Sequence, residues 1–345
     1  MKWVCPVKWI CPVKWIRRLG WAWLAVSGLA AAQPSPDLQI TEAPMPPGLE
    51  TVEFFSPAVN RRMKFDIVLP ASYADGEQRY PVVYLLHGFM QNYTVWGRNL
   101  NGAYYARLLD GMILVAPDGG NTWFVNYAES DPDKPDNWED HLIQDVIGYV
   151  DSHYRTHARR EGRAVAGLSM GGFAALSLGL RHPDLFVSLG STSGALSYAR
   201  SEAQRIRQGI PWQGQARNPQ MQGRIAEADA VISGIIDIPG FSTQEERSPL
   251  RAAFVTVEQA EAYDPFTIIY NVPKRRLPHI YLDSGTEDGL MAEARELLGI
   301  LLVNNVAVDF MQSQGAHNAE YWRRSIGHLL TIQFEVMQRA LGNRP

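Results

Sequence analysis

Cysteine is almost missing from this 345-residue sequence, which contains Cys5 and Cys11 and no other thiol. A disulfide framework or a thiolate metal site is therefore excluded for the rest of the chain. An excess of positive charge is also missing, because 32 Lys and Arg stand against 36 Asp and Glu and the net charge is −4. Nucleic-acid-binding proteins usually carry a basic surface, so we expect no nucleic-acid partner.

A hydrophobic run long enough to cross a bilayer is lacking as well. The longest apolar stretch near the start, from Leu19 to Ala32, has 14 residues, whereas a spanning helix needs about 20. Five Lys and Arg and no acidic residue precede it, and it ends in three alanines before Gln33. This layout is typical of a secretory signal peptide over residues 1–32, cleaved near Ala32, with a membrane anchor as the alternative. We expect a secreted or periplasmic protein without a stable membrane anchor.

The remaining sequence predicts a short tether and one large domain. Residues 33–48 contain five prolines, which favour an extended segment. From residue 49 to 345, two strand-like runs, Thr51 to Phe55 and Met63 to Leu69, precede short apolar runs that alternate with helical patterns. This alternation predicts an α/β fold with a mostly parallel sheet flanked by helices. The further strands are expected at Val82–Leu86, Met112–Ala116, Arg163–Ala166, Phe186–Leu189, His279–Leu282 and Val306–Met311, and the helices at Asp140–Tyr154, Gly172–Arg181, Glu293–Asn304 and Ala319–Leu341.

Residues 197–271 fit the alternation poorly. This stretch is rich in Gln, Arg and Ala and shows no clear central strand. One interpretation is an insertion of helices and loops over the carboxyl edge of the sheet, where ligands of open α/β proteins bind. The other is a set of ordinary connecting helices.

The segment Gly167 to Gly172, with the sequence Gly-Leu-Ser-Met-Gly-Gly, carries the strongest chemical signal. It lies between a predicted strand and a predicted helix, as a nucleophile elbow requires. In such an elbow, glycines permit a tight turn that leaves the serine exposed at a helix amino terminus, where backbone amides favour negative charge. A phosphate-binding loop is the competing use of such glycines, but no Gly-Lys-Ser/Thr follows. Ser169 is therefore the predicted nucleophile.

A catalytic serine also needs a histidine and an acid. In α/β folds with a nucleophile elbow, the acid follows the serine and precedes the histidine along the chain. Four histidines follow Ser169, and of these His317 alone lies in a predicted loop between a late strand and the last helix. That position makes His317 the predicted base.

The acid is expected in the loop after the strand that begins at His279. Asp288 is the predicted acid, because Asp283 falls on the strand and Glu287 is expected to point to the other side of the turn. Glu287 stays open as the alternative.

Two backbone amides are predicted to form the oxyanion hole, those of Met170 and of Phe89, the latter in the loop after an early central strand. His87 precedes the nucleophile, so the order along the chain argues against its being the base. The predicted substrate contacts are four residues in loops: His87, Trp96, Trp123 and Trp212.

Several segments together resemble the esterase D, feruloyl esterase and mycolyltransferase-like family of α/β-hydrolases, over about residues 50–340. The resemblance implies an α/β-hydrolase fold and places the family's serine, acid and histidine on Ser169, Asp288 and His317. Some members carry a glutamate in the acid loop, which keeps Glu287 open. Besides the elbow, the matching segments are Leu85-Leu86-His87-Gly88-Phe89, Ala116-Pro117-Asp118-Gly119-Gly120-Asn121, Asp151-Ser152-His153-Tyr154-Arg155, Gly285-Thr286-Glu287-Asp288, and Gly315-Ala316-His317 leading to Tyr321-Trp322-Arg323.

These features predict a secreted serine esterase that forms an acyl-serine intermediate and needs no cofactor or metal. Small aryl or alkyl esters, or esters linked to a polysaccharide, are the expected substrates. A secreted acyltransferase with the same triad is the first alternative, and a non-catalytic binding protein with a hydrolase fold is the second. The sequence does not determine the oligomeric state.

Overall fold

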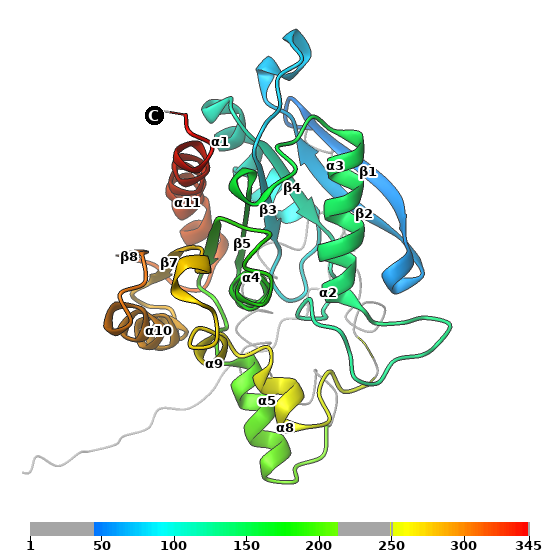
Figure 1. Ribbon diagram of the computed structural model, residues 1–345, viewed down its shortest axis with the longest axis vertical. Helices are drawn as coiled ribbons and strands as arrows, with labels where there is room; N and C mark the ends of the chain where they lie inside the picture. The colour runs from blue at the N-terminus through cyan, green and yellow to red at the C-terminus, as the bar shows by residue number, and fades with distance from the viewer. Residues whose placement is uncertain (1–44, 213–248, 250, 344–345) are drawn as a thin grey trace, which may run out of the picture. The chain divides into compact units, whose positions relative to one another are not determined.

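A single mixed sheet organises the residues that the computed structural model describes, which are 45–212, 249 and 251–343. Within these residues the sheet has eight strands in the order β1-β2-β4-β3-β5-β6-β7-β8 (Figure 1). β1 and β2 form an antiparallel hairpin, and β2 pairs antiparallel with β4. Every other pairing in the sheet is parallel. The strands are β1 Leu49–Ser56, β2 Arg61–Val68, β3 Val82–Leu86, β4 Ile113–Pro117, β5 Arg163–Leu168, β6 Ser188–Thr192, β7 His279–Gly285 and β8 Val308–Ser313.

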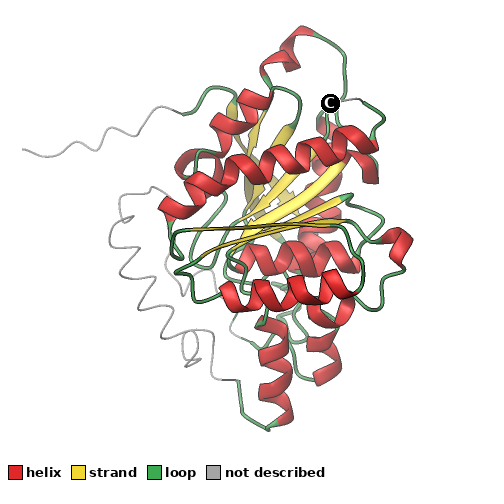
Figure 2. Ribbon diagram, turned by 90° about the vertical axis from the view of Figure 1, so that its left-hand side faces the viewer, coloured by secondary structure: helices red, strands yellow, loops and turns green. Residues whose placement is uncertain are grey.

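Helices cover both faces of this sheet (Figure 2). Along β3, Val82, Tyr84 and Leu86 pack into one hydrophobic cluster and Val83 and Leu85 into the other, as the two-residue period of a strand requires. The first cluster includes residues of α3, α4 and α10, and the second includes residues of α1 and α11. The helices are α1 Gly102–Leu109, α2 Trp138–Asp140, α3 Ile147–His153, α4 Met170–Arg181, α5 Tyr198–Arg207, α8 Val257–Glu261, α9 Pro265–Ile268, α10 Met291–Val303 and α11 Ala319–Ala340.

The predicted α/β class and the mostly parallel sheet are confirmed. The largest shift concerns the strand expected at Phe186–Leu189, which the structure places at Ser188–Thr192. Phe186 instead lies fully buried before the strand, with its ring edge-on to Tyr84. The helix α1 was not expected, because it is only eight residues long and begins after Asn101, which adopts a left-handed conformation.

Several sequence predictions lie wholly or partly outside the described residues. The predicted signal peptide and most of the predicted tether lie within residues 1–44, which are not described. The described ends of the proposed insertion contain helices α5, α8 and α9, whereas residues 213–248 and 250 are not described. All described residues belong to one compact unit. In the described part of the chain, no helix combines the length and the apolar character that a membrane span requires.

Glu139, in α2, is the centre of a buried network of ion pairs and hydrogen bonds with Arg181, His182 and Tyr263. Both carboxylate oxygens of Glu139 accept from the Arg181 guanidinium at 3.1 Å, and His182 Nε2 lies 2.6 Å from Oε1. The Tyr263 hydroxyl donates to Oε2. Burial opposes the charge, but these donors outweigh it and lower the pKa of Glu139 from 4.5 to about 2.

The Glu139→Gln variant is therefore expected to unfold with a free energy lower by about 3 kcal/mol at pH 7. Because the folded-state pKa is depressed, the carboxylate stabilises the fold above pH 4.5, and this contribution is lost as the pH falls towards 2. Urea unfolding at pH 7 and pH 3 should show that the gap between wild type and variant narrows at the lower pH. Glu335→Gln, which removes an exposed carboxylate on α11, is the control and should cost less than about 0.5 kcal/mol. A gap that does not change with pH contradicts this account of the network.

Candidate active site

Ser169 occupies a strained position between the central strand β5 and the helix α4. Its backbone has φ 52° and ψ −115°, a combination of angles that residues other than glycine rarely adopt. Hydrogen bonds hold this strain in place, because the Ser169 amide donates to Thr192 O at 3.1 Å and the amides of Phe173 and Ala195 donate to Ser169 O. The side chain of Ser169 is left partly exposed.

Gly171 allows the first turn of α4 to lie against the end of β3. A Cβ atom at this position would stand 2.2 Å from Leu86 O and 2.6 Å from His87 O, closer than any side chain can approach. The elbow therefore lies directly beside the loop that follows β3.

His317 connects Ser169 to Asp288. Its Nε2 lies 3.1 Å from Ser169 Oγ, and its Nδ1 lies 3.0 Å from Asp288 Oδ2. His317 follows β8, and Asp288 follows β7, so two adjacent strands carry them to the same edge of the sheet. Backbone bonds from Thr286 N to Ser313 O and from Glu287 N to Gly315 O join the two loops. The structure thus brings together the three residues that the sequence selected.

The side chains of His317 and Asp288 differ in how much of their surface is exposed to solvent. The His317 side chain is 35% exposed and that of Asp288 is 1% exposed. Burial alone would raise the pKa of Asp288, but the hydrogen bond and charge of His317 and the amide of Leu290 outweigh it, so this pKa is lowered. Asp288 therefore stays ionised and accepts the Nδ1–H of His317, which leaves the Nε2 lone pair directed at Ser169.

Neither of the other two carboxylates in this region contacts His317 in the described structure. Glu287 is exposed, and its Oε1 lies 3.4 Å from Gln314 Nε2. Asp283 is buried on β7, where it accepts hydrogen bonds from the hydroxyls of Thr192 and Tyr321. Burial raises the pKa of Asp283 to about 6. The geometry therefore favours Asp288 as the acid.

The two predicted oxyanion-hole amides are unpaired within the described residues. Met170 begins α4, so its amide has no partner inside the helix, and neither it nor the Phe89 amide donates a hydrogen bond to another described residue. In the same part of the chain, no three His, Cys, Asp or Glu side chains converge to hold a metal ion.

A family model described as "Putative esterase" matches residues 56–329 of the sequence. The match covers the elbow, the acid loop and the histidine loop. The chain belongs to this esterase family. The family resemblance inferred from the sequence is thereby confirmed.

Several proteins that are named as esterases resemble the chain over different lengths. The protein "Esterase Rv1288" of Mycobacterium tuberculosis is 34% identical over 155 residues, which are 45% of this chain and 34% of that protein. The chain thus matches about a third of that relative. An "Acetyl esterase" of Caldicellulosiruptor saccharolyticus is 22% identical over 289 residues, which are 80% of this chain and 94% of that protein. Among solved structures, a "ferulic acid esterase" superposes with a TM-score of 0.60 at 21% identity, over 84% of this chain and 98% of that one, and shows the same fold.

Three of the predicted substrate contacts are side chains that the structure buries, which argues against direct contact with a substrate. Trp96 is fully buried, and its indole donates to Leu86 O at 2.9 Å, so it supports the end of β3. His87 is also fully buried and bonds to backbone groups. Trp123 is 3% exposed because its ring stacks on Tyr198 with centroids 3.7 Å apart. Trp212 is partly exposed and directly precedes the residues that are not described, so its substrate contact stays a prediction.

An aromatic cluster next to the nucleophile was missed by the sequence reasoning. Trp123 packs edge-on against Phe173, one turn after Ser169, and lies 6.3 Å from the ring of Phe89. Tyr198 completes the cluster from α5. The spacing of these residues in the sequence, from 89 to 198, gives no signal that they meet.

Proposed function

We propose that this protein hydrolyses carboxylic esters through an acyl-serine intermediate on Ser169. The observation that carries the proposal is the continuous hydrogen-bonded chain from Ser169 Oγ through His317 to Asp288. The serine is at the start of a helix, and two unpaired amides lie beside it, which is the combination that acyl transfer requires.

The first half of the reaction forms the intermediate. Ser169 Oγ attacks the ester carbonyl carbon while its proton passes to His317 Nε2, and the carbonyl oxygen gains negative charge towards the amides of Phe89 and Met170. Asp288 stabilises the resulting imidazolium through Nδ1–H. The tetrahedral intermediate then collapses, the bond to the alcohol oxygen breaks, and His317 gives its proton to the leaving alcohol.

Water completes the second half. His317 Nε2 takes a proton from water, whose oxygen attacks the acyl carbon, and collapse returns the proton to Ser169 Oγ as the carboxylic acid leaves. An alcohol in place of water would instead give a new ester, which is the acyltransferase alternative.

Esters of small acyl groups are the proposed substrates, because a relative that matches 80% of the chain is named "Acetyl esterase". Nitrophenyl esters of increasing chain length and methyl ferulate, with and without added alcohol, test this proposal. We expect turnover that is fastest with short acyl chains and that yields free acid. Formation of a new ester at a higher rate than free acid supports the transferase, and absence of turnover on every ester contradicts the proposal.

We also propose that the protein is exported, because residues 1–32 have the layout of a signal peptide. Amino-terminal sequencing of the protein from fractionated cells should give a start near Gln33 in the periplasm or medium. An intact amino terminus in the cytoplasmic fraction contradicts export.

A further inference from the structure

A tight turn directly after β3 presents the Phe89 amide. Gln91 N–H donates to Gly88 O at 3.2 Å, which closes a four-residue turn, and Met90 in its third position has φ 62°. Gly88 N–H donates to Gln91 Oε1 at 2.8 Å, and Met90 N–H donates to Asn121 Oδ1 at 2.7 Å. The amides on both sides of Phe89 are therefore occupied, whereas the Phe89 amide is left for another acceptor.

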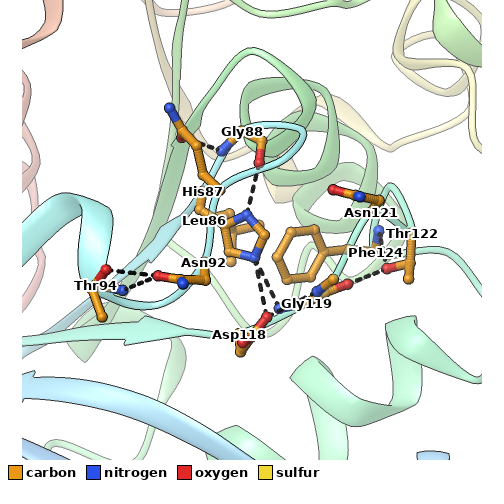
Figure 3. Close-up of polar contacts among 12 residues, drawn as sticks. Leu86, His87, Gly88, Asn92, Thr94, Asp118, Gly119, Asn121, Thr122 and Phe124 are labelled. Carbon is orange, nitrogen blue, oxygen red and sulfur yellow. Dashed lines mark hydrogen bonds and ion pairs between the residues drawn. The ribbon is translucent and has the colours of Figure 1, made fainter. Parts of the chain in front are cut away.

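His87 lies beneath this turn with both ring nitrogens in contact with backbone groups (Figure 3). Gly119 N–H donates to Nε2 at 3.0 Å, so Nε2 must carry the lone pair. Nδ1 lies 2.8 Å from Gly88 O, which only accepts, so Nδ1 must carry the proton. These two contacts together select one neutral tautomer. The Asp118 carboxylate lies 3.6 Å from Nε2.

Gly88 O and the Phe89 N–H belong to the same peptide group. This group is planar and trans, so its C=O and N–H point in opposite directions. A hydrogen bond that fixes the direction of Gly88 O therefore fixes the direction of the Phe89 N–H as well.

We propose that His87 is a positioning residue that aims the Phe89 amide into the oxyanion hole. This inference rests on the proposed function, because it assigns a role to a group next to the same site. It replaces the substrate contact expected for His87 with a role exerted through the backbone.

The loop after β4 holds His87 in turn. The Asp118–Gly119 peptide donates to His87 through Gly119 N–H, and its Asp118 carbonyl oxygen lies 3.1 Å from His141 Nε2. Burial lowers the pKa of His141 to about 4, so this ring is neutral near pH 7 and donates to the carbonyl through Nε2–H. Two buried histidines thus hold two peptide groups from different loops: His141 and His87 bond to Asp118–Gly119, and His87 bonds to Gly88–Phe89.

Close packing brings the turn to the nucleophile. A Cβ atom at Gly88 would stand 2.5 Å from Leu168 Cδ1, and Leu168 immediately precedes Ser169. A larger residue at position 88 would require the side chain of Leu168, or that of Gln91 at 3.0 Å, to shift.

Substitution of His87 by asparagine or by glutamine distinguishes its two hydrogen bonds, because each variant can keep only one of them. In His87→Asn the side-chain N–H₂ can occupy the place of Nδ1 and keep the bond to Gly88 O. In His87→Gln the side-chain oxygen can occupy the place of Nε2 and keep the bond from Gly119, while the bond to Gly88 O is lost. Both variants have similar polarity and leave a similar amount of the pocket filled.

Hydrolysis of a nitrophenyl ester and of its thionoester by wild type and both variants tests the proposal. Loss of a complete oxyanion-hole donor lowers kcat by about 10²–10³-fold, so a misdirected donor in His87→Gln should lower it by about 10–100-fold with KM nearly unchanged. Sulfur is a weaker acceptor than oxygen, so the ester-to-thionoester rate ratio should fall in the same variant. His87→Asn should retain most of both quantities.

His279→Asn is the matched control, because His279 also bonds through both ring nitrogens, to Ser188 and Asp309, but at the start of β7. It should change stability without changing the ester-to-thionoester ratio. Equal losses in the Asn and Gln variants of His87, or an unchanged ratio in the Gln variant, overturn the inference. If wild type itself hydrolyses no ester, the proposed function fails and not this assignment alone.

Discussion

Replacing Ser169 with alanine is expected to lower kcat for ester hydrolysis by about 10⁶-fold, because the variant lacks the atom that accepts the acyl group. The oxyanion-hole amides and the binding site would remain, so a residual rate of about 10³–10⁴-fold over water is expected. KM should change little, since Ser169 Oγ contributes mainly to the transition state. Steady-state kinetics with a nitrophenyl ester measure both quantities.

Ser177→Ala is the matched control for this experiment. Ser177 lies on the same helix, α4, is buried and donates to Tyr263 O at 2.8 Å. Its removal should cost about 1 kcal/mol of stability and leave kcat unchanged. Hydrolysis that survives in Ser169→Ala at the wild-type rate contradicts the assignment of the nucleophile.

Replacing Asp288 with asparagine is expected to lower kcat by about 10⁴-fold. The carboxylate accepts Nδ1–H of His317, whereas an amide can present an N–H to Nδ1 and favour the tautomer whose Nε2 carries the proton. That tautomer cannot take the proton of Ser169. The expected loss is therefore in kcat and not in KM.

Glu287→Gln distinguishes the two acids that the sequence left open. Glu287 is exposed and lies near Gln314, so its replacement should change kcat by less than about two-fold. A large loss in Glu287→Gln together with a small loss in Asp288→Asn contradicts the geometry described here.

Local pattern was sufficient to predict the elements that position the site. The place of Ser169 at the turn between β5 and α4 could be predicted because such a tight turn requires small residues at fixed spacing, as Gly171 illustrates. His317 and Asp288 could be found because chain order and strand ends restrict where the base and the acid can lie. The same reasoning predicted the parallel strands from their short apolar runs.

Burial and packing between distant segments limited the prediction of the surroundings. A tryptophan in a loop can face a ligand or the core. The bond that places Trp96 in the core goes to Leu86 O, at the end of β3 and ten residues earlier in the chain. Likewise, the stacking of Trp123 on Tyr198 joins two segments that no periodicity connects. The role of His87 depends on Gly119, whose approach is set by the neighbouring strand β4.

Ser169 is expected to carry the acyl group during turnover. Rapid quenching of the reaction with a nitrophenyl acetate, followed by mass spectrometry of the digested protein, tests it most directly. An acetyl group should appear on the peptide that contains Ser169 within the first turnover and should be lost as substrate runs out. Continued ester hydrolysis with no acetyl group on Ser169, or with the group on another residue, would contradict it.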